Sequence, residues 1–142
     1  MSKLEKVVYT AKATSTGGRE GTSKSDDGRL TLNLSTPKAL GGNDGHGTNP
    51  EQLFAAGYSA CFIGALKVAA VNEKQKLSDD LAVDAEVGIG PITGGYNVNA
   101  KLTVRAPSMD RAVLENLVNK AHEICPYSNA TRGNIDVQLV IG

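Results

Sequence analysis

The chain has 142 residues and a mass of 14.8 kDa, which suits one domain with a substantial core and is too short for two. Fifteen Lys and Arg residues balance fifteen Asp and Glu residues, so the formal net charge is zero and bulk electrostatics does not favour a nucleic-acid partner. We therefore predict a single domain over residues 1–142 with no nucleic-acid function.

The composition also bears on location. Residues 1–13 carry three lysines and no long apolar run, which argues against a secretory signal or a transit peptide. The longest uncharged stretch, 52–66, is shorter than the ~20 apolar residues that a membrane span needs. We expect a cytoplasmic protein with no membrane partner, in which Cys61 and Cys125 stay mostly reduced.

The N-terminal part predicts a three-stranded meander. Val7–Thr16 is rich in β-branched residues and should form the first strand, with Gly17-Gly18 as the turn. Arg19–Ser25 is the expected returning strand, and Asp26–Gly28 is a second turn signal. Leucines that alternate with polar residues over Leu30–Leu34 predict the third strand.

A polar, glycine-rich loop at Ser35–Thr48 leads into the least polar segment of the chain. Asn49 can cap a helix, Pro50 suits its first position and Gln52 fits a capping box, so a helix is predicted from here to Glu73. Few polar residues remain on any side, and we expect burial on most sides. One predicted face consists of Leu53, Phe54, Gly57, Cys61, Gly64, Ala65 and Val68.

The C-terminal half predicts a polar connection over Lys74–Asp80, a hairpin, a helix and a closing strand. The hairpin strands alternate over Leu81–Ile89 and Tyr96–Val104, joined by a Gly90–Gly95 link. Helical spacing begins at Ser108 and should stop at Pro126, and Ile135–Ile141 alternates again. The order β-β-β-α-β-β-α-β predicts an α+β fold built on antiparallel sheet.

Few large side chains are available for the core: two Phe, four Tyr and no Trp. Close packing of the small-residue helix between two copies of the chain is a reasonable way to bury it, so we predict a homodimer.

Cys61 allows two interpretations. A free cysteine is a small apolar residue that is usually buried for packing. A reactive cysteine needs a nearby cation, because an apolar helix would otherwise raise the pKa of its thiol. Arg19 is a candidate for that cation, and Glu51 could hold it in a bidentate pair. Ten residues of straight helix separate Glu51 from Cys61 by ~15 Å, so a shared site needs a helix break near Gly57 or a bridging arginine.

Two further motifs give weaker signals. The string CPYS at 125–128 is similar to the Cys-Pro-Tyr-Cys of glutaredoxins, but Cys125 is predicted to close a helix rather than open one. The string GYSAC at 57–61 lacks the second glycine of a hydrolase elbow. Two isolated histidines and two distant cysteines do not predict a metal site.

Three strings together resemble the organic hydroperoxide resistance (Ohr) proteins of the OsmC/Ohr family. They are GREG at 18–21, GTNPEQLFAAGY at 47–58 leading to Cys61-Phe62, and CPYSNAT at 125–131 followed by RGN at 132–134. The resemblance runs nearly end to end, and CPYS and the chain length favour the Ohr branch.

The resemblance implies a cofactor-free cysteine peroxidase that reduces organic hydroperoxides, especially lipid-derived ones, to alcohols. It implies that Cys61 is the peroxidatic thiol, Cys125 the resolving thiol, and Arg19 with Glu51 the polar pair that activates Cys61. It also implies an intertwined homodimer with sheets wrapped around two central helices, and reduction by a dithiol such as a lipoylated protein.

Two other classes of function stay open from the sequence. A fatty-acid-binding or lipid-binding module would use the same apolar surroundings without turnover. A thiol-disulfide oxidoreductase would use the same two cysteines on a protein disulfide.

Overall fold

The computed structural model describes residues 3–142. The chain divides into two compact units, the first ending at Pro50 and the second being Glu51–Gly142. The prediction that residues 1–142 form one domain stays a prediction.

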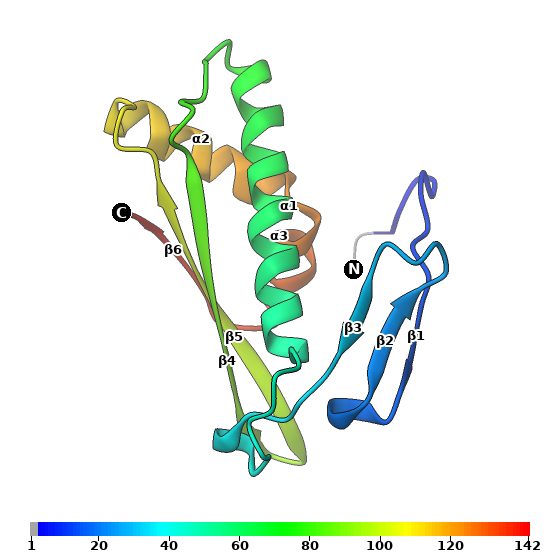
Figure 1. The fold of residues 1–142 in the computed structure, drawn as a ribbon. Helices are drawn as coiled ribbons and strands as arrows, with labels where there is room; N and C mark the ends of the chain where they lie inside the picture. The colour runs from blue at the N-terminus through cyan, green and yellow to red at the C-terminus, as the bar shows by residue number, and fades with distance from the viewer. Residues whose placement is uncertain (1–2) are drawn as a thin grey trace. The chain divides into compact units, whose positions relative to one another are not determined.

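The first unit contains the predicted antiparallel meander. Its strands β1 (Ala13–Thr16), β2 (Thr22–Ser25) and β3 (Thr31–Asn33) lie in the order β1-β2-β3 (Figure 1). A short 3-10 helix, η2 (Lys38–Leu40), lies in the glycine-rich loop that follows. The turn between β2 and β3 has Gly28 at φ 74°, a conformation that favours glycine.

Two predictions about this unit were wrong. The first strand begins at Ala13 instead of Val7. Arg19 lies in a 3-10 helix, η1 (Gly18–Glu20), so the returning strand begins only at Thr22. The reason for the second difference is the Gly17-Gly18 pair, whose positive φ values of 73° and 55° turn the chain in a way that an extended strand cannot.

The second unit begins with the long helix α1 (Pro50–Asn72), as the capping signals predicted. It is followed by β4 (Ala82–Ile92), β5 (Gly95–Arg105), α2 (Arg111–Ile124), α3 (Pro126–Thr131) and β6 (Val137–Ile141). The strands form a sheet in the order β4-β5-β6 (Figure 1).

The pairing in this sheet is mixed. β4 and β5 form the predicted antiparallel hairpin, with both strands running closer to the turn than expected because Gly94 at φ 83° permits a two-residue link. β5 and β6 are parallel, since α2 and α3 form the crossover between them. The predicted α+β class is confirmed. The sheets differ from the expected antiparallel arrangement in one parallel pair, β5 with β6.

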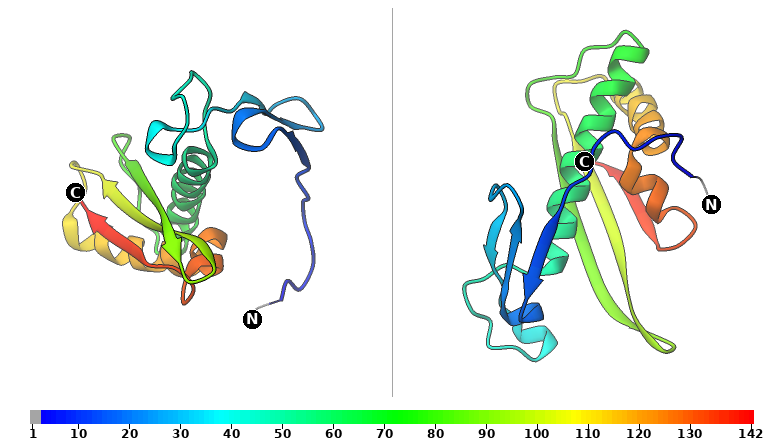
Figure 2. Two further views of the ribbon diagram at one scale, coloured as in Figure 1. Left: turned by 90° about the horizontal axis from the view of Figure 1, so that it is seen from below. Right: turned by 90° about the vertical axis from the view of Figure 1, so that its right-hand side faces the viewer.

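One face of the sheet packs with α1 and α2 into the hydrophobic core. β5 contributes alternating buried residues, and the amphipathic helix α2 contributes a buried stripe that matches most of the predicted spacing. In the left view of Figure 2, α1 is seen nearly end-on beside the sheet. The largest buried core side chains are Tyr58, Phe62, Leu66, Leu102, Val104 and Leu117.

The structure shows which of the two apolar faces of α1 enters the core. Tyr58, Phe62 and Leu66 point into the core, whereas Gly64 and Val68 are exposed. The spacing could not distinguish the two faces because both are apolar. Burial on most sides was therefore wrong for the single chain, which leaves an apolar stripe of α1 in contact with solvent.

By length and composition alone, α1 is long and apolar enough to cross a membrane. The core helix of a globular protein passes the same test, so this is weak evidence for a span. Here one side of α1 carries fully buried core side chains that pack with the sheet and α2.

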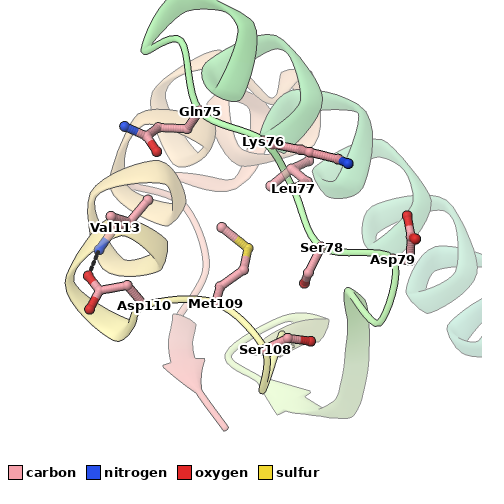
Figure 3. Close-up of a pocket in the computed structure, with 9 residues that line it drawn as sticks. All are labelled: Gln75, Lys76, Leu77, Ser78, Asp79, Ser108, Met109, Asp110 and Val113. Atoms are coloured by element: carbon pink, nitrogen blue, oxygen red, sulfur yellow. Dashed lines mark hydrogen bonds between the residues drawn. The ribbon is translucent and has the colours of Figure 1, made fainter.

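A cavity of about 370 Å³ lies between the connection that follows α1 and the turn that precedes α2 (Figure 3). At its rim, the Asp110 carboxylate caps α2 by accepting a hydrogen bond of 3.1 Å from the Val113 N–H. The lining residues run from Gln75 to Asp79 and from Ser108 to Val113, and they include neither cysteine.

Candidate active site

The structure brings the two cysteines together. Cys61 lies in the middle of α1 and Cys125 at the junction of α2 and α3, and their Sγ atoms are 3.7 Å apart. Both are free thiols; Cys125 is fully buried and Cys61 is half-buried. Of the two, Cys61 is therefore the one that a small molecule can reach, and Cys125 lies behind it.

The helix α3 was not predicted. Pro126 ends α2 as expected, but it also occupies the first position of α3, so Cys125 is at once the C-cap residue of α2 and the N-cap residue of α3. The expectation that Cys125 only closes a helix was wrong. Proline is favoured at the first helical position, and this was the signal in the sequence that could have revealed α3.

The pKa of the Cys61 thiol is raised above its ordinary value. Burial is the main cause, because an apolar environment disfavours the thiolate, and the neighbouring Cys125 thiol raises the pKa further. The backbone N–H of Tyr127, in the first turn of α3, acts in the opposite direction by hydrogen bonding to the sulfur. Its effect is smaller than that of burial, so the pKa stays above its ordinary value.

Aromatic side chains gather one turn of α1 before Cys61. The ring of Tyr127 has its centroid 6.0 Å from that of Phe54 and 5.7 Å from that of Tyr58. Gly57 allows this approach, since a Cβ at that position would lie 2.8 Å from the Tyr127 hydroxyl. Tyr127 keeps 38% of its surface exposed, so it forms an apolar wall at the edge of the site.

Sequence reasoning also missed the role of Tyr58. Its hydroxyl lies 2.9 Å from Ser128 Oγ and 3.1 Å from Thr131 Oγ1, and all three side chains are buried. These hydrogen bonds join α1 to α3 across 70 and 73 sequence positions. The only signal for this contact was the string SNAT at 128–131, which contains two hydroxyl side chains but does not indicate what they bind.

Arg19 and Glu51 belong to different units. Arg19 is half-buried in η1 of the first unit, where its carbonyl accepts a hydrogen bond of 3.5 Å from Thr36 Oγ1. Glu51 is half-buried in the first turn of α1. Because α1 is continuous from Pro50 to Asn72, the helix break near Gly57 that would bring Glu51 to Cys61 does not occur. The roles of both residues stay predictions.

Comparison with known proteins shows which family this chain is similar to. Residues 41–140 match the family described as OsmC-like protein. The organic hydroperoxide resistance protein of Xanthomonas axonopodis pv. citri is 58% identical over 141 residues, which cover 99% of either chain.

Solved structures are similar as well. The crystal structure of the organic hydroperoxide resistance protein OhrB of Bacillus subtilis has a TM-score of 0.86 and 44% identity, covering 96% of this chain and 100% of that one. That of an organic hydroperoxide resistance protein from Elizabethkingia anophelis has a TM-score of 0.90 and 47% identity, with 96% and 98% coverage. The chain therefore belongs to the OsmC/Ohr family, as an organic hydroperoxide resistance protein.

Proposed function

We propose that the protein is a two-cysteine peroxidase that reduces organic hydroperoxides to alcohols. The observation that carries this proposal is the 3.7 Å separation of the Cys61 and Cys125 sulfurs, with the accessible sulfur in front of the buried one. The names of its relatives supply the substrate class. No cofactor is needed, because sulfur itself can accept the oxygen.

In the first step, the Cys61 thiolate attacks the distal oxygen of the hydroperoxide. An S–O bond forms, the O–O bond breaks, and the alkoxide leaves as the alcohol after taking up a proton. The sulfur loses two electrons and becomes a sulfenic acid.

In the second step, Cys125 attacks the sulfur of that sulfenic acid. An S–S bond forms, the S–O bond breaks and the oxygen leaves as water. The sulfurs need to approach by about 1.6 Å to reach the disulfide distance of about 2.05 Å. A dithiol reductant, such as a dihydrolipoyl group on a protein, would then return both cysteines to thiols by thiol-disulfide exchange.

Arg19 and Glu51 are proposed to assist the first step. The guanidinium would stabilise the Cys61 thiolate, opposing the burial that raises the pKa of this thiol, and would orient the peroxide. Glu51 would restrict the arginine through a bidentate pair. Since α1 is unbroken, the arginine side chain would have to span the distance along the helix between Glu51 and Cys61.

The aromatic wall favours an alkyl substrate over hydrogen peroxide. Phe54 and Tyr127 offer apolar surface near Cys61, on which an alkyl chain can be removed from water. Steady-state kinetics with a dithiol reductant would test this. We expect a higher kcat/KM for a long-chain hydroperoxide than for hydrogen peroxide, and equal values would refute the substrate preference.

A homodimer is proposed from the surface of α1. One side of this helix exposes Ala56, Ala60, Gly64, Val68 and Val71, which are three or four positions apart and therefore form one apolar stripe. The more exposed of the two valines, Val71, keeps 76% of its surface accessible to solvent. Small residues let two helices approach closely, so a second copy of α1 is the partner that fits. The cytoplasm stays the predicted location.

A further inference from the structure

The three hydroxyl groups of Tyr58, Ser128 and Thr131 form a directional chain. Thr131 Oγ1 lies 2.9 Å from the Tyr127 carbonyl oxygen, which can only accept, so the Thr131 hydroxyl donates to it. Thr131 Oγ1 then accepts the Tyr58 proton, and the Tyr58 oxygen accepts the Ser128 proton. Every donor has an acceptor, which is what a buried polar cluster requires to be stable.

This chain of hydroxyls holds α3 next to the cysteines. Tyr58 precedes Cys61 by three residues, which is about one turn or ~4.5 Å along α1. Ser128 and Thr131 follow Cys125 within the single short helix α3. α3 is thus joined to α1 by the hydroxyls of Tyr58, Ser128 and Thr131, one turn of α1 before Cys61.

A helix of six residues needs such support. α3 spans only Pro126–Thr131, and helices of that length are not stable in isolation. The Tyr58 ring contacts Phe54 and Tyr127 in any case, so its apolar packing does not require a hydroxyl. The hydroxyl is the part of this side chain that hydrogen-bonds to α3.

We infer that Tyr58 is a positioning residue for the two-cysteine reaction. Through Ser128 and Thr131 its hydroxyl holds α3 against α1 and keeps the Cys125 sulfur within reach of Cys61. This inference rests on the proposed function for the step in which the disulfide forms. It adds a residue that acts on both cysteines without touching the substrate.

The variant Tyr58→Phe tests it, since the ring stays and only the hydroxyl is lost. After one equivalent of an alkyl hydroperoxide, rapid-quench mass spectrometry follows conversion of the sulfenic acid to the disulfide. We expect this step to slow by about tenfold, because misplacement of reacting groups by a fraction of an ångström is costly.

A second measurement needs no peroxide. In a Cys125→Ala background, the pH dependence of Cys61 alkylation by iodoacetamide reports its thiolate. Adding Tyr58→Phe should move the midpoint to higher pH, since the Tyr127 amide is then held less firmly and stabilises the thiolate less.

Val104→Ala is the matched control. Val104 is fully buried in β5, so this variant also lowers stability, but Val104 takes no part in the hydrogen bonds of the three hydroxyls. It should leave both the resolution rate and the alkylation midpoint unchanged. A folded Tyr58→Phe protein that behaves like the control in both measurements would overturn the inference.

The outcomes separate the inference from the proposed function. If the wild-type protein forms no disulfide with peroxide, the peroxidase proposal fails, whereas the alkylation midpoint still decides whether Tyr58 positions α3. Should Tyr58→Phe not fold, Ser128→Ala removes one hydroxyl of the chain and is expected to shift both readouts in the same direction. Unchanged readouts in folded Ser128→Ala would also overturn the inference.

Discussion

The sulfurs of Cys61 and Cys125 lie 3.7 Å apart although 64 sequence positions separate the two residues. Because Cys125 is buried and Cys61 is half-buried, an oxidant meets Cys61 first. A sulfenic acid formed there would be next to the second thiol from the start. That order of events leads to predictions about each cysteine and its surroundings.

The two cysteines should respond differently to substitution. Cys61→Ser is expected to abolish peroxide consumption, because the attacking sulfur is gone. Cys125→Ser should consume one equivalent of hydroperoxide and then accumulate Cys61 with about 16 Da of added oxygen, since no thiol can resolve it. Intact mass after stoichiometric peroxide distinguishes the two. If Cys125→Ser lost even the first round, the assignment of roles would be wrong.

Replacement of Cys125 should also change the ionisation of Cys61. Burial raises the pKa of the Cys61 thiol first, and Cys125 raises it further. Cys125→Ala removes the second cause, so the thiolate midpoint should move to lower pH while the effect of burial persists. Alkylation rates of Cys61 over a pH series measure this midpoint. A midpoint at higher pH would mean instead that the hydrogen bond that the Cys125 thiol donates to Cys61 stabilises the thiolate more than the neighbouring sulfur disfavours it.

Gly57→Ala should disturb the aromatic wall. The new methyl group would lie 2.8 Å from the Tyr127 hydroxyl and 3.3 Å from its ring, so the ring must move. Stability should change by no more than about 1 kcal/mol, because alanine favours the helix by a similar amount. The kcat/KM for a long-chain hydroperoxide should fall more than that for hydrogen peroxide.

The double variant Gly57→Ala with Tyr127→Phe is the control for that prediction. It removes the hydroxyl that makes the closest contact, so the effect of Gly57→Ala should be smaller in this background. Equal effects in both backgrounds would show that Gly57 acts by some route other than Tyr127.

The exposed stripe of α1 predicts the oligomeric state. Sedimentation should give about twice the 14.8 kDa of one chain at micromolar concentration. Val71→Asp places a charge on the stripe and should shift the protein toward the monomer, whereas Lys101→Asp, on the opposite face of the sheet from the core, should not. A wild-type mass near that of one chain would reject the dimer.

Local signals made much of the fold predictable. Asn49, Pro50 and Gln52 marked the start of α1, and the alternation over the hairpin strands located β4 and β5. The same local rules failed where one residue serves two elements. Pro126 was interpreted only as the end of α2, although it also begins α3.

The candidate site was predictable only in part. Its cysteines were identified through strings that resemble a family, but periodicity could not show that their sulfurs meet. The pairing of Tyr58 with Ser128 joins residues 70 positions apart, and no local pattern encodes such a hydrogen bond. The face of α1 that enters the core was also ambiguous, because apolar residues surround the helix on nearly all sides.

The rival functions differ from the proposed one in simple assays. A lipid-binding module would bind a fatty acid with both cysteines changed to serine, and the native protein would consume no peroxide. A thiol-disulfide oxidoreductase would reduce a protein disulfide rapidly. Slow reduction of such a disulfide together with fast reduction of an alkyl hydroperoxide would favour the peroxidase.

The most direct test mixes the reduced protein with one equivalent of an alkyl hydroperoxide and no other reductant. The account predicts rapid loss of the peroxide and a mass decrease of about 2 Da, the two hydrogens lost when Cys61 and Cys125 form a disulfide. Persistence of the peroxide with both thiols still titratable would contradict it, and the cysteines would then be packing residues.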